Sequence, residues 1–108
     1  MNVEAVELGE WTSQVEVKAG IAARRFSFKA GQVMPGHKHQ SAHATVVLKG
    51  ELLLILTWDD GRKVWERTYK AGDFFEVPAD AVHQVRAVSD VEWLCLFADP
   101  ELSGWVDG

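Results

Sequence analysis

Apolar residues along this chain fall into short alternating or continuous runs, and no helical period of useful length precedes the C-terminal tail. Turns that contain glycine separate these runs, which is typical of short strands in an antiparallel sandwich or barrel. The pattern therefore predicts an all-β fold, a small antiparallel β-barrel or jelly roll. The expected strands cover residues 21–29, 44–49, 51–58, 63–69, 74–77, 83–88 and 91–97.

The turns between these runs carry their own signals. The Asp-Asp-Gly sequence of residues 59–61 predicts a hairpin, because a tight hairpin turn needs positive φ. Gly50 and Gly72 punctuate the chain in the same way. Near the end, Asp99 as N-cap and Pro100 at the first position predict a short helical turn.

Residue parity sorts side chains into interior and exterior. Phe26 and Phe28 share one face while Arg25 and Lys29 share the other, so the phenylalanines are expected to point inward. Arg24 has the parity of the phenylalanines and would be a charge on an inward face. It could extend to the rim, pair with a carboxylate or anchor an anionic substrate.

Some predicted strands are apolar on both faces. Residues 44–48 and 52–55 have this composition, and so does the last strand, where parity alone does not choose the inward face between Trp93 and Leu94. A small barrel has one interior, so a second apolar face indicates that another subunit covers it. We therefore predict a homodimer; the alternative is that the N-terminal segment or the tail around Trp105 covers this face.

Composition narrows the class of protein. With 108 residues there is room for one hydrophobic core, and we predict a single domain over residues 1–108. A net charge of −5 without a basic cluster argues against nucleic acid and membrane partners. Residues 1–4 do not resemble the start of a signal peptide, and the single cysteine, Cys95, permits no internal disulfide. These features predict a cytoplasmic protein.

All four histidines fall into one spacing pattern. His37, His39 and His43 lie between Gly31 and Gly50 in the order Gly-x5-His-x-His-x3-His-x6-Gly. On a helix the second and third would lie about 200° and 240° around from the first, whereas extended chain projects all three to one face. Neutral imidazole is the commonest ligand of divalent transition metals, so the pattern indicates a metal site on strands.

The residues around these histidines resemble the cupin superfamily. The family's first motif matches residues 31–50, except that His43 stands where a glutamate is usual. Its second motif, Gly-x5-Pro-x-Gly-x2-His-x3-Asn, matches residues 72–87 at Gly72, Pro78 and His83, with Asp80 in place of glycine and alanine in place of asparagine. Asp tolerates the left-handed turn conformation that this glycine position implies. The resemblance implies a small β-barrel of jelly-roll type.

The resemblance also implies one divalent transition metal ion held by His37, His39, His43 and His83. Manganese, iron, nickel, cobalt, copper and zinc all stay open. Four neutral imidazoles leave the charge of the ion at +2, whereas the usual glutamate would lower it. The centre is therefore expected to be a stronger Lewis acid with more acidic bound water.

Inward parity predicts an apolar pocket beside this ion, and three functions compete for it. The first is a dioxygenase-type metalloenzyme that acts on a small, fairly apolar substrate. The second is a non-redox isomerase, lyase or cyclase, and the third a module that binds a metal or small molecule without turnover. Catalytic residues other than the ligands are not identified. The expected pocket residues are Phe26, Phe28, Met34, Val85, Trp93, Cys95 and Phe97.

Overall fold

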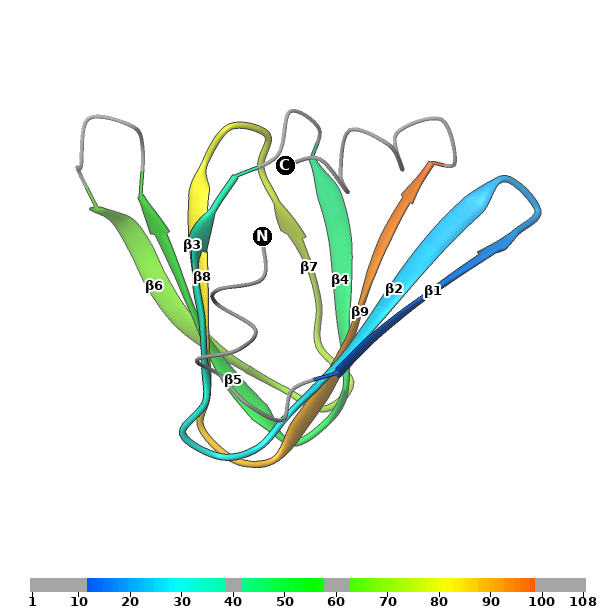
Figure 1. Ribbon diagram of the computed structural model, residues 1–108. Helices are drawn as coiled ribbons and strands as arrows, with labels where there is room; N and C mark the ends of the chain where they lie inside the picture. The colour runs from blue at the N-terminus through cyan, green and yellow to red at the C-terminus, as the bar shows by residue number, and fades with distance from the viewer. Residues whose placement is uncertain (1–11, 39–41, 58–62, 99–108) are drawn as a thin grey trace.

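The computed structural model describes residues 12–38, 42–57 and 63–98, and within them every regular element is a strand. The strands are short and alternate buried with exposed positions, as expected where one face of each strand packs on a core. In chain order they are β1 (Thr12–Lys18), β2 (Ile21–Phe28), β3 (Val33–His37), β4 (His43–Lys49), β5 (Glu51–Thr57), β6 (Lys63–Lys70), β7 (Phe74–Val77), β8 (Val82–Ala87) and β9 (Val91–Ala98) (Figure 1).

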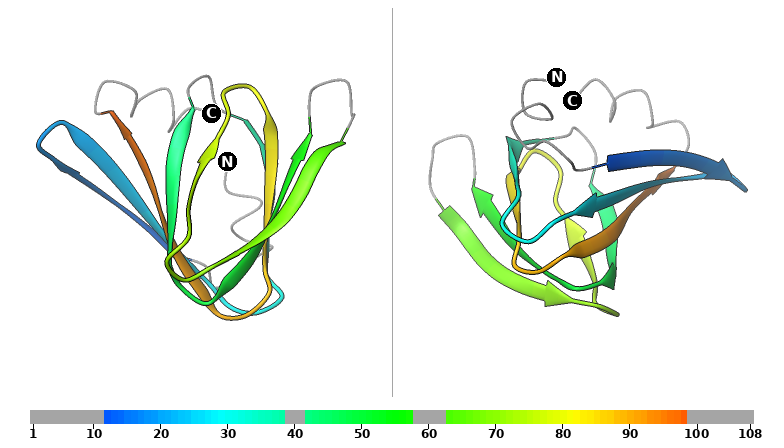
Figure 2. Two further views of the ribbon diagram at one scale, coloured as in Figure 1. Left: turned by 180° about the vertical axis from the view of Figure 1, so that it is seen from behind. Right: turned by 60° about the horizontal axis from the view of Figure 1, so that its bottom comes forward.

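The strands form two antiparallel sheets that face each other. One sheet has the order β1-β2-β9-β4-β7 and the other the order β3-β8-β5-β6. Figures 1 and 2 show that the sheets converge at one end and diverge at the other, so the molecule is a wedge with a narrow and a wide end. The all-β prediction is confirmed in its jelly-roll form. Among the described strands, pairing does not join the two sheets into a closed barrel.

The core lies between the two sheets. Leu52, Leu54 and Leu56 of β5 are buried on one side of it, while alternate residues of β9 are buried on the other. On β9 the inward face is the one with Trp93, whereas Leu94 is partly exposed on the outer face. Residue parity left the inward face of β9 open. Packing against the opposite sheet decides that it is the Trp93 face.

Two strands were not expected from the sequence. β1 is an edge strand whose Val15 and Val17 stay more than 40% exposed, so it carries no strong core signal. β3 contains Pro35 and Gly36, which lower strand propensity and are tolerated at the edge of a sheet. Both strands are held by pairing with a neighbour rather than by a hydrophobic pattern of their own.

Turn geometry explains several residues of the two motifs. Gly50 has a φ of +76°, and a Cβ there would collide with the carbonyl oxygen of Asp90 in the turn before β9. Asp80 has a φ of +64°, so the tolerance of aspartate for the left-handed region is used at this position. β5 and β6 pair as a hairpin, although residues 59–61 themselves lie outside the described residues, as does the helical turn expected at Asp99.

The described segments contain no helix that is long and apolar enough to cross a membrane.

Candidate functional site

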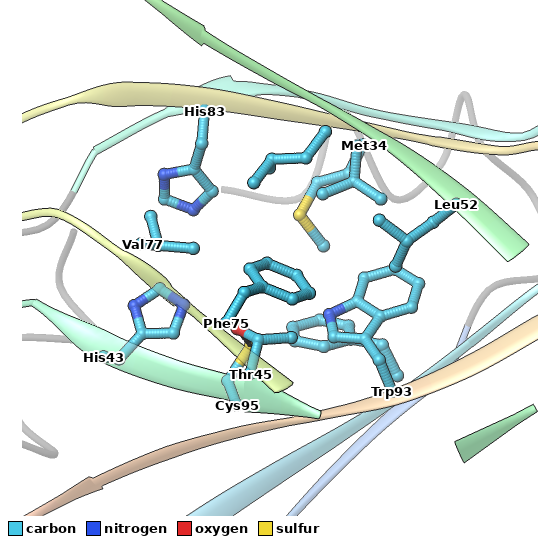
Figure 3. Close-up of a pocket in the computed structure, with 12 residues that line it drawn as sticks. Met34, His43, Thr45, Leu52, Phe75, Val77, His83, Trp93 and Cys95 are labelled. Carbon is cyan, nitrogen blue, oxygen red and sulfur yellow. Dashed lines mark hydrogen bonds between the residues drawn. The ribbon is translucent and has the colours of Figure 1, made fainter. Parts of the chain in front are cut away.

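A pocket lies between the two sheets, and strands of both contribute to its wall (Figure 3). Its cavity volume of about 20 Å³ has room for one or two water molecules. Apart from two histidines, the lining side chains are uncharged. They are Phe26, Met34, His43, Thr45, Leu52, Leu54, Phe75, Val77, His83, Val85, Trp93 and Cys95.

Two of the predicted metal ligands meet at one end of this pocket. His43 begins β4 in the five-stranded sheet, and His83 lies near the start of β8 in the four-stranded sheet. Both are only 5% exposed, and their ring centres are 5.7 Å apart with an angle of 59° between the planes. Figure 3 shows the two rings on the same side of the pocket, away from Trp93 and Leu52. Two buried imidazoles, one from each sheet, thus lie next to each other at one end of the pocket.

The surroundings of these rings suit metal binding. An imidazole nitrogen lies about 2.0–2.1 Å from a bound ion, so a ring separation of 5.7 Å leaves room for one ion between His43 and His83. Nδ1 of His83 is 3.4 Å from the carbonyl oxygen of Ala81. A proton on Nδ1 would donate to this oxygen and leave the Nε2 lone pair for a metal, as ligating histidines commonly do. The donor set therefore fits a divalent transition ion.

The backbone pairing of β3 with β8 brings a third predicted ligand to this end of the pocket. His37 is the last residue of β3, and its Cα is paired directly with that of His83 across the β3–β8 ladder. At Gly36 a Cβ would lie 3.0 Å from Cγ1 of Val82, so glycine relieves the close approach of the two strands here. The small residue keeps β3 against β8 at the position of the histidines.

The fourth predicted ligand, His39, lies outside the described residues, as does the side chain of His37. Within the described part of the chain, His, Cys, Asp and Glu side chains nowhere gather in a group of three or more that could hold a metal ion. Of the four predicted ligands, the structure describes the side chains of His43 and His83, and the complete ligand set stays a prediction.

The other end of the pocket is aromatic and apolar. Phe26 stacks on Trp93 with ring centres 5.1 Å apart, and Phe28 lies 5.0 Å from the same indole ring. Five of the seven expected pocket residues contribute to the wall: Phe26, Met34, Val85, Trp93 and Cys95. Phe28 and Phe97 do not. Phe28 packs behind Phe26 and Trp93, and Phe97 is buried two residues beyond Cys95, so both belong to the core beside the pocket.

Five lining residues were missed by sequence reasoning. Thr45 follows His43 by two positions on β4, and this parity could have indicated it, but its polar side chain did not suggest an interior position. Leu52 and Leu54 lie in a strand that is apolar on both faces, which hides its parity. Phe75 and Val77 come from β7, which is too short for a clear alternation.

Cys95 lies in the pocket wall as a buried thiol. Burial raises its pKa to about 12, although contacts with Thr45 and Trp93 and the charge of Arg24 act in the opposite direction. The Thr45 hydroxyl approaches Sγ at 3.9 Å. The thiol therefore stays protonated near neutral pH and is a poor nucleophile.

Arg24 has the inward parity but does not line the pocket. Its guanidinium carbon lies 5.6 Å from the centre of the Phe26 ring, which is the geometry of a cation–π contact. Partial burial lowers its pKa from the usual value. Of the roles expected from the sequence, anchoring a substrate inside this pocket is the one that its position does not support.

Comparison with known proteins identifies the family. A model described as "Cupin domain" matches residues 24–97, which include all of the first motif and all of the second. The chain therefore belongs to the cupin family. The match joins both sheets and both visible histidines in one unit.

Named relatives share this domain over part of their length. The chain is 32% identical over 85 residues to germin-like protein 3-5 of Oryza sativa subsp. japonica and 31% identical over 84 residues to oxalate oxidase 2 of Hordeum vulgare. These alignments cover 76% and 75% of this chain but only 37% of each relative. The chain thus spans little more than a third of the length of these curated relatives.

A solved structure supports the fold. Oxalate decarboxylase of Bacillus subtilis, studied for its Mn(II) centres, superimposes with a TM-score of 0.66 at 19% identity. The superposition covers 81% of this chain and 27% of that protein. At this identity the likeness shows the cupin fold alone.

Proposed function

We propose that this protein is a metal-dependent enzyme whose single divalent transition ion is held by His37, His39, His43 and His83. The observation that carries the proposal is the pair of buried imidazoles, His43 and His83, which face each other from opposite sheets. The pairing of His37 with His83 brings a third histidine of the motif to the same end. The proposal requires the His37 and His39 rings to turn toward this pair.

The metal is proposed to be redox-active, with manganese and iron as the leading choices. The Mn(II) centres of the B. subtilis oxalate decarboxylase and the oxalate oxidases among the relatives favour this class of ion. When bound, such an ion would bring a small substrate and dioxygen together and exchange electrons with them. With four neutral ligands it would keep its full +2 charge, unlike a site with a glutamate.

The pocket wall favours a dioxygenase-type reaction on a small, fairly apolar substrate. Its described lining residues include no Asp, Glu, Lys or Arg. An isomerase or lyase needs a general acid or base beside the ion, and Thr45 and the protonated Cys95 are poorly suited to that task. A dicarboxylate such as oxalate would meet no cationic side chain in this wall, so we propose a substrate other than oxalate.

The chain's own residues would then bind and orient this substrate. The aromatic end around Trp93 and Phe26 would receive its apolar part and exclude water from it. The Thr45 hydroxyl, two residues from His43 on the same face, is a hydrogen-bonding group for its polar part. Because the cavity of about 20 Å³ holds only one or two water molecules, side chains of its wall would have to move apart to admit such a substrate with its polar end at the histidines.

The proposal is tested by metal analysis of protein purified without oxygen and without added metal, with spectra before and after exposure to oxygen. We expect one redox-active ion per chain and a spectral change that His83→Ala abolishes. Oxygen uptake is then measured with small aromatic and aliphatic ketones, phenols and monocarboxylates, with oxalate as the control substrate. Stoichiometric zinc, or equal turnover of oxalate, would contradict the proposed class of reaction.

We further infer that the protein acts in the cytoplasm as a homodimer. The first inference rests on the composition, with its single cysteine. The second rests on the outer surface of the five-stranded sheet.

A further inference from the structure

The pocket between the sheets is closed on one side by a side chain that is itself partly exposed. Eleven of the twelve residues that line the pocket are at most 8% exposed. The twelfth, Phe75, is only partly buried and packs against the edge of the core. It belongs to β7, the edge strand of the five-stranded sheet. Among the described residues that line the pocket, Phe75 is therefore the one that also reaches solvent.

The boundary between β6 and β7, which we call the side seam, is closed by side chains. β6 is the edge of one sheet and β7 the edge of the other, and among the described strands these two do not pair. The ring of Phe75 stacks on the ring of Tyr69 across the side seam, with centres 3.8 Å apart and planes 10° apart. Such a contact can open by rotation about side-chain bonds, without loss of a backbone hydrogen bond.

The backbone beside this contact is held in place. In the turn from β6 to β7, the N–H of Lys70 donates to Oδ2 of Asp73 at 2.9 Å, and the N–H of Asp73 donates to the carbonyl oxygen of Lys70 at 2.9 Å. The N–H of Gly72 donates to the carbonyl oxygen of Val47 on β4 at 2.8 Å. Opening of the side seam is therefore expected to move the side chain of Phe75 rather than the strand that carries it.

The side chains behind Phe75 lead toward the histidines. Phe75 is paired with Thr45, and Thr45 with Cys95, so these three form one row that projects into the pocket (Figure 3). His43 lies two residues before Thr45 on the same face of β4. A molecule that passes Phe75 would meet the Thr45 hydroxyl, which is proposed to orient the polar part of the substrate, and then His43.

The inner face of β6 lines the approach to Phe75. Trp65, Arg67 and Tyr69 share this face, because they pair with the buried leucines of β5. Arg67 is exposed, and its guanidinium carbon lies 5.4 Å from the centre of the Tyr69 ring. The carboxylates of the two strands, Glu66 and Glu76, have the opposite parity and face outward. The approach thus offers aromatic rings beside a positive charge.

We propose that Phe75 is a gate, whose ring rotates away from Tyr69 to admit a small flat substrate through the side seam. This inference rests on the proposed function for the use of the gate. The vacated face of Tyr69 would stack a planar ring or conjugated group as it now stacks Phe75. Arg67 would attract a carboxylate or phenolate and repel an amine. The cavity of about 20 Å³ holds no such molecule while Phe75 stays in place.

The first test uses the thiol of Cys95, behind the gate, to measure access to the pocket. The full chain, as purified and after chelation of its metal, is treated with the small neutral reagent methyl methanethiosulfonate, and labelling is followed by mass spectrometry. Phe75→Ala should raise the labelling rate on the order of tenfold, because local opening is no longer needed. Met34→Ala is the matched control, since it enlarges the pocket at a buried position of β3, the opposite edge of its sheet.

Phe75→Leu is a second variant, in case the alanine variant does not fold. Leucine keeps an apolar side chain and removes the ring stack with Tyr69, so labelling should again be faster than in the wild type. Urea denaturation of each variant gives the share of labelling that passes through the unfolded chain. Labelling that follows unfolding alone would overturn the gate, and so would equal acceleration by Met34→Ala.

A second test addresses the charge at the entrance. The sulfonatoethyl and trimethylammonioethyl methanethiosulfonates share a reactive group and differ in the sign of their charge. Relative to the urea-unfolded chain, the anionic reagent should label the Phe75→Ala protein faster, and adding Arg67→Gln should lower this preference by about threefold. An unchanged preference would overturn the role of Arg67. Both tests work without metal, so a failure of the proposed function would show instead in metal analysis and oxygen uptake.

Discussion

The two ends of the pocket are built from different chemistry on the same strands. At the wide end, His43 and His83 place two buried imidazoles 5.7 Å apart. At the narrow end, Phe26 and Trp93 stack at 5.1 Å, and the described residues that line this part of the pocket are aromatic or aliphatic. The histidine end carries polar ring nitrogens, whereas the aromatic end is made by packing of apolar side chains. We therefore expect substitutions at the histidine end to change mainly metal binding, and substitutions at the aromatic end to change mainly the free energy of unfolding.

The largest effect should come from the narrow end. Trp93→Ala removes a 2% exposed indole ring that contacts two phenylalanines, and such a truncation costs about 3–5 kcal/mol of unfolding free energy. Urea denaturation of the metal-free protein measures this loss. Leu53→Ala, a partly exposed aliphatic position on the outer face, serves as the control and should cost far less. Equal losses would mean that the narrow end is not the main store of stability.

His83→Ala should have the opposite profile. Removing a ligand should lower metal affinity by more than the roughly 10–100-fold that follows loss of a ligand's hydrogen-bond partner. The stability of the metal-free protein should change less than in Trp93→Ala. Titration with a competing chelator measures affinity, and urea denaturation measures stability. Unchanged metal affinity would contradict imidazole ligation and would remove the distinction between the ends.

Cys95, between the two ends, should give an intermediate effect that depends on pH. Its pKa is raised to about 12 in the folded chain from 9.0, so the folded state holds the proton more tightly. The corresponding stability is complete below pH 9 and is lost as pH rises from 9 toward 12. Wild-type protein should therefore lose more stability than Cys95→Ser between these values. A thiol reagent should label native protein slowly and urea-unfolded protein at once; rapid native labelling would show an accessible thiolate.

The smallest effect on metal occupancy is expected for His43→Glu, which restores the ligand usual in the family. Glutamate supplies one oxygen, so an ion should still bind, but the centre loses a unit of positive charge. Oxygen-dependent turnover should fall while occupancy in elemental analysis stays near that of the wild type. Equal occupancy and equal turnover would show that the charge of the four-histidine set does not matter.

Several of these residue positions were predicted from the sequence. Strong alternation predicted β2 and the inward position of Phe26, and the spacing of the histidines brought His43 and His83 into one hypothesis. Asp80 in the left-handed region followed from the chemistry of its side chain. These predictions succeed because each depends on local periodicity or turn geometry.

Other features depend on what lies across the gap or outside it. Parity did not decide the inward face of β9, because Leu94 and Leu96 form part of an apolar outer face as well. Thr45 entered the pocket through its pairing with Cys95, a contact between strands distant in sequence. The exposed β1 and the proline-containing β3 are edge strands stabilised by a neighbour. Sequence patterns record burial well and record partners poorly.

The origin of the two histidines in different sheets has a mechanical consequence. The end of β3 and the starts of β4 and β8 lie where the wedge is widest, the place where two facing sheets part most easily (Figure 1). An ion bound by both His43 and His83 would link the two sheets at this end. Its binding free energy would add to the free energy of unfolding. Acid would protonate the imidazoles, release the ion and remove this contribution to stability. The supply of metal in a cell would then govern how long each folded copy survives, as well as how fast it reacts.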